Sequence, residues 1–140
     1  MDCPIEILEA MGDACVTFAA KTKEGLVTSS EKGIAPMMRL LLQDETALEG
    51  AFVADRVIGK ATAVLLLYGN ASFVHADLMS EHAASLLSEN GFAFSYDQLV
   101  PYIKNRRQDG MCPMEQTVLE VDDVPVAFEA LKQKWLAMQA

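Results

Sequence analysis

The sequence predicts an α/β fold, a three-layer α/β/α sandwich built on a mixed five-stranded sheet. Residues 51–96 alternate between short apolar segments and helix-like segments, with connections of only a few residues. This spacing is typical of parallel strands joined by right-handed helical crossovers. Two β-rich segments before residue 30, separated by a polar turn, add an antiparallel pair to the same sheet.

The composition is that of one globular domain spanning residues 1–140. Hydrophobic residues make up 51% of the chain and charged residues 22%, which suits a folded protein. The net charge of −9 disfavours nucleic acids and anionic membranes as partners. The longest apolar run, residues 61–68, is far shorter than the roughly 18 residues of a membrane span. The three cysteines are widely separated and form no CxxC pair, so we expect a reduced, cytoplasmic protein.

The first part of the chain contains two helical segments and a hairpin. Helical spacing followed by a glycine predicts a short amphipathic helix from Ile5, Leu8, Met11 and Gly12. Residues 14–20 and 26–29 favour strands, and the polar residues 21–25 connect them. Pro36 precedes the helical segment 37–43, where its missing N–H costs little.

The central part predicts strand, helix, strand, helix and strand, in that order, over residues 51–55, 60–68, 72–79, 81–89 and 92–96. The 60–68 segment is apolar nearly all round, which predicts a buried helix. Towards the C-terminus we expect a last strand over residues 117–121. An amphipathic helix over residues 126–138 then carries the single tryptophan, Trp135.

The first strand-to-helix junction is the leading candidate for a ligand site. In α/β proteins, ligands bind at the carboxyl ends of strands and beside helix N-termini. A tight turn carrying Asp55, Arg56, Gly59 and Lys60 is expected here. It would place Lys60 against a carbonyl, phosphate or carboxylate, with Asp55 orienting it or acting as base. Gly59 would let the backbone approach closely or take a positive φ. In the alternative interpretation, Asp55 caps the turn, Lys60 reaches solvent and Gly59 only permits the turn.

The second strand-to-helix junction would lie beside the first. Ser80 is expected to cap the following helix, and Glu81 suits the positive end of its dipole. His82 is an acid–base candidate, although a solvent-facing histidine is the simpler interpretation. On the strand before them, His75 and Asp77 share one face. We expect a hydrogen-bonded His75 packed under a helix rather than a relay between the two.

Cys112 is the candidate nucleophile. It lies in an irregular loop downstream of Arg106, and a nearby cation or helix N-terminus would activate its thiol. The alternative is a small buried hydrophobic residue. Glu115 would be its neighbour, and Asn105 and Arg106 would complete the ligand-binding loop.

Several stretches of the chain resemble one family. They are residues 55–63 (DRVIGKATA), 80–81 (SE), 99–103 (LVPYI), 105–106 (NR) and 111–115 (MCPME). Together they resemble DUF1893, an uncharacterised bacterial family of the cytidine-deaminase-like superfamily, over most of residues 14–125. The resemblance implies a cytidine-deaminase-like fold.

The zinc-binding motifs of that superfamily are missing. Zinc deaminases carry [HC]-x-E at the start of one helix and P-C-x-x-C at the next. Here the two helices begin with GKA at 59–61 and SEH at 80–82, which supply no comparable ligand set. Cys112-Pro113 reverses the deaminase order and has no second cysteine three residues on. We therefore expect no metal and no cofactor, and predict that the chain is not a zinc deaminase.

The sequence leaves two functions open. In the first, the protein binds a small polar ligand, anionic or carbonyl-bearing, and is either a simple binder or a metal-independent enzyme for group transfer or acid–base chemistry. The catalytic candidates are Lys60, Asp55 and Cys112, and the ligand-binding candidates are Gly59, Ser80, Glu81, Asn105, Arg106 and Glu115. In the second, the chain is a non-catalytic regulatory or oligomerising module that docks through the helix carrying Trp135, for example as a homo-oligomer.

Overall fold

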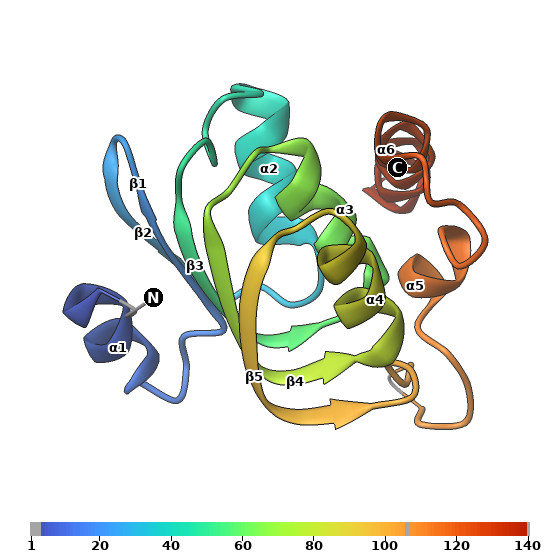
Figure 1. Ribbon diagram of the computed structural model, residues 1–140, viewed down its shortest axis with the longest axis horizontal. Coiled ribbons are helices and arrows are strands. Elements are labelled where there is room, and N and C mark those ends of the chain that lie inside the picture. Colours follow the sequence, from blue (N-terminus) through green and yellow to red (C-terminus); the bar gives the residue numbers. More distant parts are fainter. Residues whose placement is uncertain (1–3, 106, 140) are drawn as a thin grey trace.

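The computed structural model describes residues 4–105 and 107–139 (Figure 1). The elements follow one another as α1 (Ile5–Met11), β1 (Phe18–Thr22), β2 (Gly25–Ser29), α2 (Ala35–Gln43), β3 (Phe52–Ile58), α3 (Lys60–Tyr68), β4 (Phe73–Ser80), α4 (Glu81–Glu89), β5 (Ala93–Val100), α5 (Pro113–Thr117) and α6 (Val124–Gln139).

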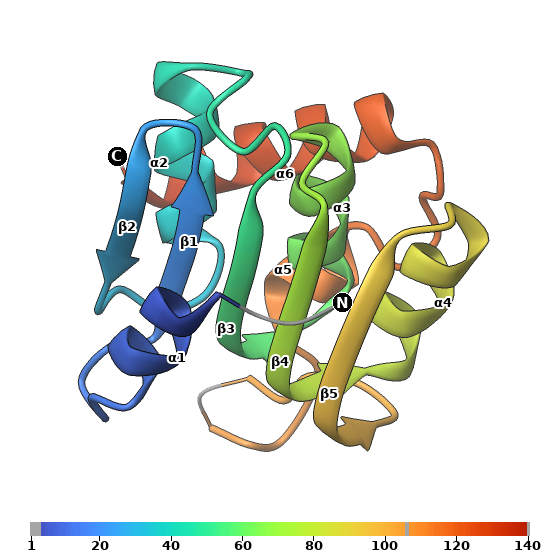
Figure 2. The same ribbon diagram turned by 60° about the vertical axis from the view of Figure 1, so that its left-hand side comes forward.

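The predicted mixed five-stranded sheet is confirmed. Its strand order is β2-β1-β3-β4-β5 (Figure 2). Strand β1 is antiparallel to both β2 and β3, and β3, β4 and β5 are parallel. The β3–α3–β4 and β4–α4–β5 units step across the sheet in the same direction, so right-handed crossovers place α3 and α4 on the same face (Figure 1).

Helices cover the two faces of the sheet unequally. On one face, α2, α3 and α4 enclose the main apolar core (Figure 1). On the other face, α1 packs against β1, β2 and β3. Its Ile7 forms a small buried cluster with Ala19 and Ala54. The sequence predicted an apolar face on α1 made by Ile5, Leu8 and Met11. That prediction is wrong for Ile5 and Leu8, which are exposed, and Ile7 is the buried residue.

Helix α6 packs on the outer side of α3, which lies between α6 and the sheet (Figure 1). This arrangement explains why α3 is buried nearly all round, as its sequence predicts. The ring of Phe128 stacks on Tyr68 with 3.8 Å between centroids, and the guanidinium of Arg39 lies 5.2 Å from the Trp135 ring. Trp135 is buried in the core, so it is not available for the docking surface predicted on this helix.

Strand β3 extends further than predicted. Its pairing with β4 continues through Val57 with Leu78 and Ile58 with Met79. Asp55 and Arg56 therefore belong to the strand and do not form a turn, and Gly59 alone connects β3 to α3. Polar residues at these two positions suggested a turn, but each is accommodated within the sheet.

The predicted strand over residues 117–121 is also wrong. The segment instead follows α5, which has Pro113 in its first turn, where a proline is favourable. Thr117 closes this helix by donating its hydroxyl to the carbonyl of Pro113 at 2.8 Å. Val118 then inserts into the core. The fifth strand of the sheet is β5, which runs on to Val100.

Candidate functional site

The two predicted junctions meet at the carboxyl ends of β3 and β4. These strands are parallel neighbours, so the N-termini of α3 and α4 lie side by side. Ser80 caps α4, as predicted, because its hydroxyl accepts a 3.0 Å hydrogen bond from the backbone N–H of Ala83. Glu81 is exposed in the first turn of that helix.

The side chain of Glu115 occupies this junction. It is 1% exposed. Its Oε2 accepts hydrogen bonds from the backbone N–H of Lys60 at 2.6 Å and from the hydroxyl of Ser80 at 2.5 Å, and its Oε1 accepts one from the backbone N–H of Ile103 at 2.7 Å. An anion is favoured at a helix N-terminus, and here the protein supplies that anion from α5.

Gly59 is needed because the backbone and Glu115 approach closely. A Cβ at this position would lie 2.9 Å from Glu115 Oε2 and 2.9 Å from Ile103 Cγ1. The φ of Gly59 is −99°, which any residue adopts. Of the two roles that the sequence allowed, the structure therefore supports close approach, and the group that approaches is a carboxylate of the protein itself.

The side chain of Lys60 points away from Glu115. Its ammonium donates to the carbonyl of Leu119 at 2.8 Å and to Asp122 Oδ1 at 2.6 Å. The Lys60 side chain is only 6% exposed, whereas that of Asp122 is 73% exposed. This pair lies in an open hollow lined by Lys60, His82, Ser85, Leu86, Glu89, Leu119 and Asp122.

Asp55 is a buried carboxyl group within the sheet. It pairs in register with Phe18 on β1 and Ala76 on β4, both members of the main core. The backbone N–H of Val57 donates to its Oδ1 at 3.4 Å. Burial raises the pKa of Asp55 well above its usual range, against the lowering effect of backbone hydrogen bonds. No hydrogen bond joins Asp55 to Lys60 within the described residues.

Cys112 precedes α5 and is half-buried. Its backbone N–H donates to the carbonyl of Ile103 at 2.7 Å, and its side chain packs against the main core. This environment matches the small-hydrophobe interpretation. Arg106, the cation expected nearby, lies outside the described residues. Asn105 closes its own loop, since its Nδ2 donates to Asp109 Oδ1 at 2.9 Å.

The structure therefore brings together Gly59, the Lys60 backbone, Ser80 and Glu115. Cys112 borders this junction, since its N–H donates to the carbonyl of Ile103, whose own N–H donates to Glu115. No hydrogen bond joins the side chains of Asp55 or Asn105 to Glu115 within the described residues. Ile103, Leu119 and Asp122 also take part, and the sequence pattern did not indicate them as site residues. Two of these act through backbone atoms, which no side-chain pattern reveals. Asp122 gave a weak signal as part of an acidic pair before the last helix.

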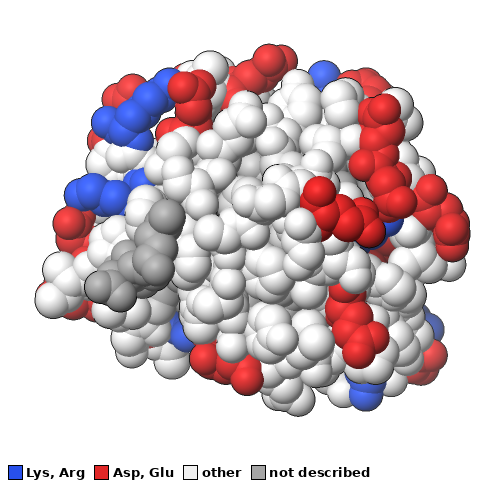
Figure 3. Space-filling model, viewed as in Figure 1, with Lys and Arg blue, Asp and Glu red and all other residues white. Residues whose placement is uncertain are grey.

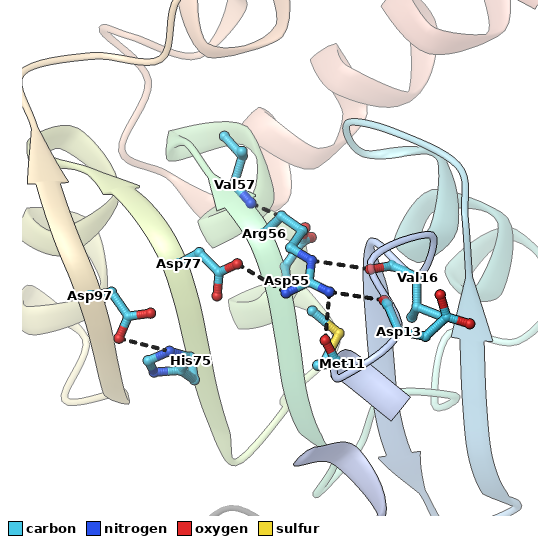
Figure 4. A network of polar contacts seen from close by, with 9 residues as sticks. All are labelled: Met11, Asp13, Val16, Asp55, Arg56, Val57, His75, Asp77 and Asp97. Carbon is cyan, nitrogen blue, oxygen red and sulfur yellow. Dashed lines mark hydrogen bonds and ion pairs between the residues drawn. The ribbon is translucent and has the colours of Figure 1, made fainter. Parts of the chain in front are cut away.

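A second polar network lies on the other face of the sheet (Figure 4). Arg56 donates to the carbonyls of Val16 at 3.1 Å, Met11 at 2.6 Å and Asp13 at 3.1 Å, and to Asp77 Oδ2 at 3.1 Å. These hydrogen bonds hold the end of α1 and the segment before β1 against the sheet. The sequence pattern does not predict these contacts of Arg56 with residues 11–16.

His75 lies on the same face of the sheet. Its Nδ1 lies 2.7 Å from the hydroxyl of Ser95. Its Nε2 lies 3.4 Å from Asp97 Oδ1 (Figure 4). The expected hydrogen bond is present. However, the neighbours Val74 and Ala76 take the core positions, so His75 does not pack under a helix and is partly exposed.

Acidic residues outnumber basic ones, with 20 Asp and Glu against 11 Lys and Arg. On the face shown in Figure 3, Asp and Glu side chains are spread over several elements, and Lys and Arg lie at separate points among them. This distribution agrees with the net charge of −9. Within the described parts of the chain, no helix is both long enough and apolar enough to cross a membrane.

Comparison with known proteins gives two findings. A family profile described as a domain of unknown function (DUF1893) matches residues 4–135. Among solved structures, the crystal structure of a DUF1893 family protein from Thermotoga maritima has a TM-score of 0.84 and 30% sequence identity, and the match covers 93% of this chain and 88% of that chain. A search of curated proteins returns no match.

Proposed function

The chain belongs to the DUF1893 family, and we propose that it binds a small polar anionic or carbonyl-bearing ligand beside Lys60. The family assignment confirms the resemblance found in the sequence motifs. One observation supports the proposal: a buried lysine whose charged partner is a highly exposed aspartate at the edge of a hollow.

The ammonium of Lys60 needs a negative partner, because an unpaired charge is costly to bury. Within the described residues it makes two hydrogen bonds, to Leu119 and Asp122. An ammonium group carries three donors, so one remains for a ligand. A carboxylate or phosphate could also replace Asp122 as the partner of Lys60.

That replacement would cost little. The Asp122 side chain is 73% exposed, so solvent screens the ion pair on the Asp122 side. When displaced, the Asp122 carboxylate would be solvated by water. The Lys60 ammonium, which is far less exposed, would keep a charged partner throughout.

The rest of the hollow suits a small polar molecule. His82, Ser85 and Glu89 recur along one side of α4 and offer donors and acceptors for carbonyl and hydroxyl groups. Leu86 and Leu119 provide apolar contacts. The volume of about 200 Å³ lies below the roughly 300–1,000 Å³ of typical ligand pockets, which limits the ligand to a small metabolite. We propose ligand binding and not catalysis, because two of the three catalytic candidates, Asp55 and Cys112, do not line the hollow.

NMR titration with inorganic phosphate and malonate, against chloride at matched ionic strength, tests this proposal. We expect saturable shifts of the backbone amides of His82, Ser85 and Asp122. Lys60→Met should abolish them, and Lys134→Met, at an exposed position, should not. Asp122→Ala, which removes the competing carboxylate, should strengthen binding at least about threefold, a change of roughly 0.6 kcal/mol. Unsaturable shifts scattered over the surface, or no gain in Asp122→Ala, would overturn the proposal.

A second candidate function, a non-catalytic module that self-associates, is supported by the edge of the sheet. Strand β5 is eight residues long, lies at the edge, and exposes Tyr96 and Leu99. An exposed apolar edge strand can pair with the same strand of another copy. Glu115 also fits this function, since it fills the junction at the carboxyl ends of β3 and β4, where α/β enzymes commonly bind substrate.

Sedimentation equilibrium tests the second candidate. A dimer mass in the wild type that becomes a monomer mass in Tyr96→Lys would support pairing through β5. A monomer mass at every concentration would exclude it. The exposed residue Leu26, on the opposite edge strand β2, provides the control variant Leu26→Lys.

We further propose a cytidine-deaminase-like fold and a location in the bacterial cytoplasm. The β3–β5 unit with its antiparallel neighbours supports the first statement. The free thiols of Cys15 and Cys112 support the second.

A further inference from the structure

We propose that His75, Asp77 and Asp97 form a binding site for a divalent transition-metal ion, of the zinc or manganese class, on the sheet face opposite α3 and α4 (Figure 4). This site is separate from the Lys60 hollow and from the helix N-termini where a zinc deaminase would hold its metal. It departs from the expectation that the chain binds no metal.

The strand register brings the three side chains together. His75 and Asp77 are two residues apart on β4, so both project from the same face. On β5, Tyr96 and Gln98 pair with Ala76 and Leu78, which sets Asp97 beside Asp77. One candidate ligand atom from each residue lies within 4.8 Å of the other two.

The ligand atoms would have to move closer to bind one ion. Zinc bonds to nitrogen and oxygen are about 2.0–2.2 Å long, so two ligands of a tetrahedral ion are about 3.3–3.6 Å apart, against the limit of 4.8 Å found here. A small side-chain rotation would bring the three atoms to that distance. Asp97 has the freedom for this rotation, since its side chain is 70% exposed.

The imidazole is already oriented for such a role. The Ser95 hydroxyl holds Nδ1 at 2.7 Å, and Nε2 faces Asp97. Histidines that bind metals commonly have the other ring nitrogen held by a hydrogen bond, which fixes the tautomer and the direction of the free lone pair. In the tautomer that carries its proton on Nδ1, this nitrogen donates to Ser95 and Nε2 is the free ligand atom.

Asp77 is oriented in the same way. Arg56 donates to its Oδ2, and three backbone carbonyls fix Arg56 in turn. Oδ1 of Asp77 thus remains for a cation. Arg56 offsets one of the two carboxylate charges, so the charged groups of the site sum to −1, which favours moderate affinity.

The donor set selects the metal. One imidazole nitrogen with two carboxylate oxygens suits zinc or manganese better than magnesium or calcium, which prefer all-oxygen sites. Three protein ligands leave further positions open for water or a ligand. The His75 side chain is 31% exposed, so an ion can reach it from solvent.

Calorimetric titration of the metal-free full chain with Zn²⁺ tests the site. Cys3→Ser and Cys15→Ser should be introduced first, to remove thiols that would bind zinc independently. We expect one Zn²⁺ per chain, with binding weakened at least about tenfold in His75→Gln and in Asp97→Asn. The only other histidine, His82, supplies the matched control, and His82→Gln should bind as the parent does.

Paramagnetic broadening by Mn²⁺ then locates the ion independently of affinity. Amide signals of residues 75–77 and 95–97 should broaden first, while those of the Lys60 hollow remain. Asp97→Asn alters an exposed side chain, so a folding defect would not explain its effect. No stoichiometric Zn²⁺ binding, undiminished binding in His75→Gln, or broadening centred elsewhere would overturn the proposal.

Discussion

Glu115 Oε2 accepts a 2.6 Å hydrogen bond from the backbone N–H of Lys60, a residue 55 positions earlier in the chain. With the bonds from Ser80 and Ile103, this contact ties α5 and the preceding loop to the N-termini of α3 and α4. The helix N-termini that suggested an anion site in the sequence are therefore occupied by a carboxylate of the protein itself. Glu115 has a structural role, and ligand binding is better sought around the Lys60 ammonium.

Glu115→Gln should destabilise the fold by about 2–3 kcal/mol. The amide keeps the volume, but its NH₂ group would face a donor and leave at least one buried N–H or O–H unpaired. Urea unfolding followed by circular dichroism measures the change. The exposed residue Glu120 supplies the control, and Glu120→Gln should lie within about 0.5 kcal/mol of the wild type. Equal stability of Glu115→Gln and wild type would contradict the structural role.

Gly59→Ala should cost about 1–3 kcal/mol, because the added methyl would lie 2.9 Å from Glu115 and from Ile103, both held in place. Thermal unfolding reports the loss. In the control Gly110→Ala, the new Cβ would meet its nearest atom, Asn105 Nδ2, at an ordinary 3.5 Å. If both variants melt together, Gly59 is a turn residue and nothing more.

The sequence predicted elements whose pattern is local. Helix α3 was placed correctly because residues 60–68 are apolar on every side, and Ser80 was recognised as a cap because capping involves only the next three residues. The order of the parallel strands followed from short connections. In each case the deciding information lies within a few residues of the element.

Contacts between distant segments were not predictable in this way. Asp55 and Arg56 looked like a turn, yet β3 continues through them because β4 pairs with residues beyond them and Arg56 finds acceptors near α1. The β-branched residues at 117–121 suggested a strand, but Val118 instead fills a core position after α5. The Glu115 contacts likewise depend on where α5 packs, which no spacing in the sequence encodes.

Leu131→Ala should destabilise the protein by about 2–5 kcal/mol, since Leu131 is fully buried in the core that α6 closes. Leu136→Ala, on the exposed side of the same helix, should change stability by less than about 0.5 kcal/mol. Denaturant unfolding compares the two. For the same reason, deletion of residues 126–140 should unfold the chain. A folded deletion product with only an altered oligomer mass would restore α6 as a docking element.

Asp55 should make stability fall as pH rises. Burial raises its folded-state pKa well above that of the unfolded chain, 3.8. Its contribution to stability is therefore complete below about pH 4 and is lost as pH increases towards the folded-state value. Asp55→Asn removes this dependence. The stability of the variant relative to wild type should thus rise continuously with pH above 4, at a limiting slope of about 1.4 kcal/mol per pH unit.

Thermal melts of the two proteins from pH 3.5 to 8 measure that difference, and its trend with pH matters more than its absolute value. Asp44 provides a control of opposite sign. Its backbone and side-chain hydrogen bonds with Thr46 lower its pKa, so it stabilises the fold above pH 4 and loses that effect as pH falls. Asp44→Asn should therefore lose stability relative to wild type as pH rises. If Asp55→Asn shows a flat profile while Asp44→Asn shows this trend, Asp55 is ionised in the folded protein and the sheet accommodates its charge.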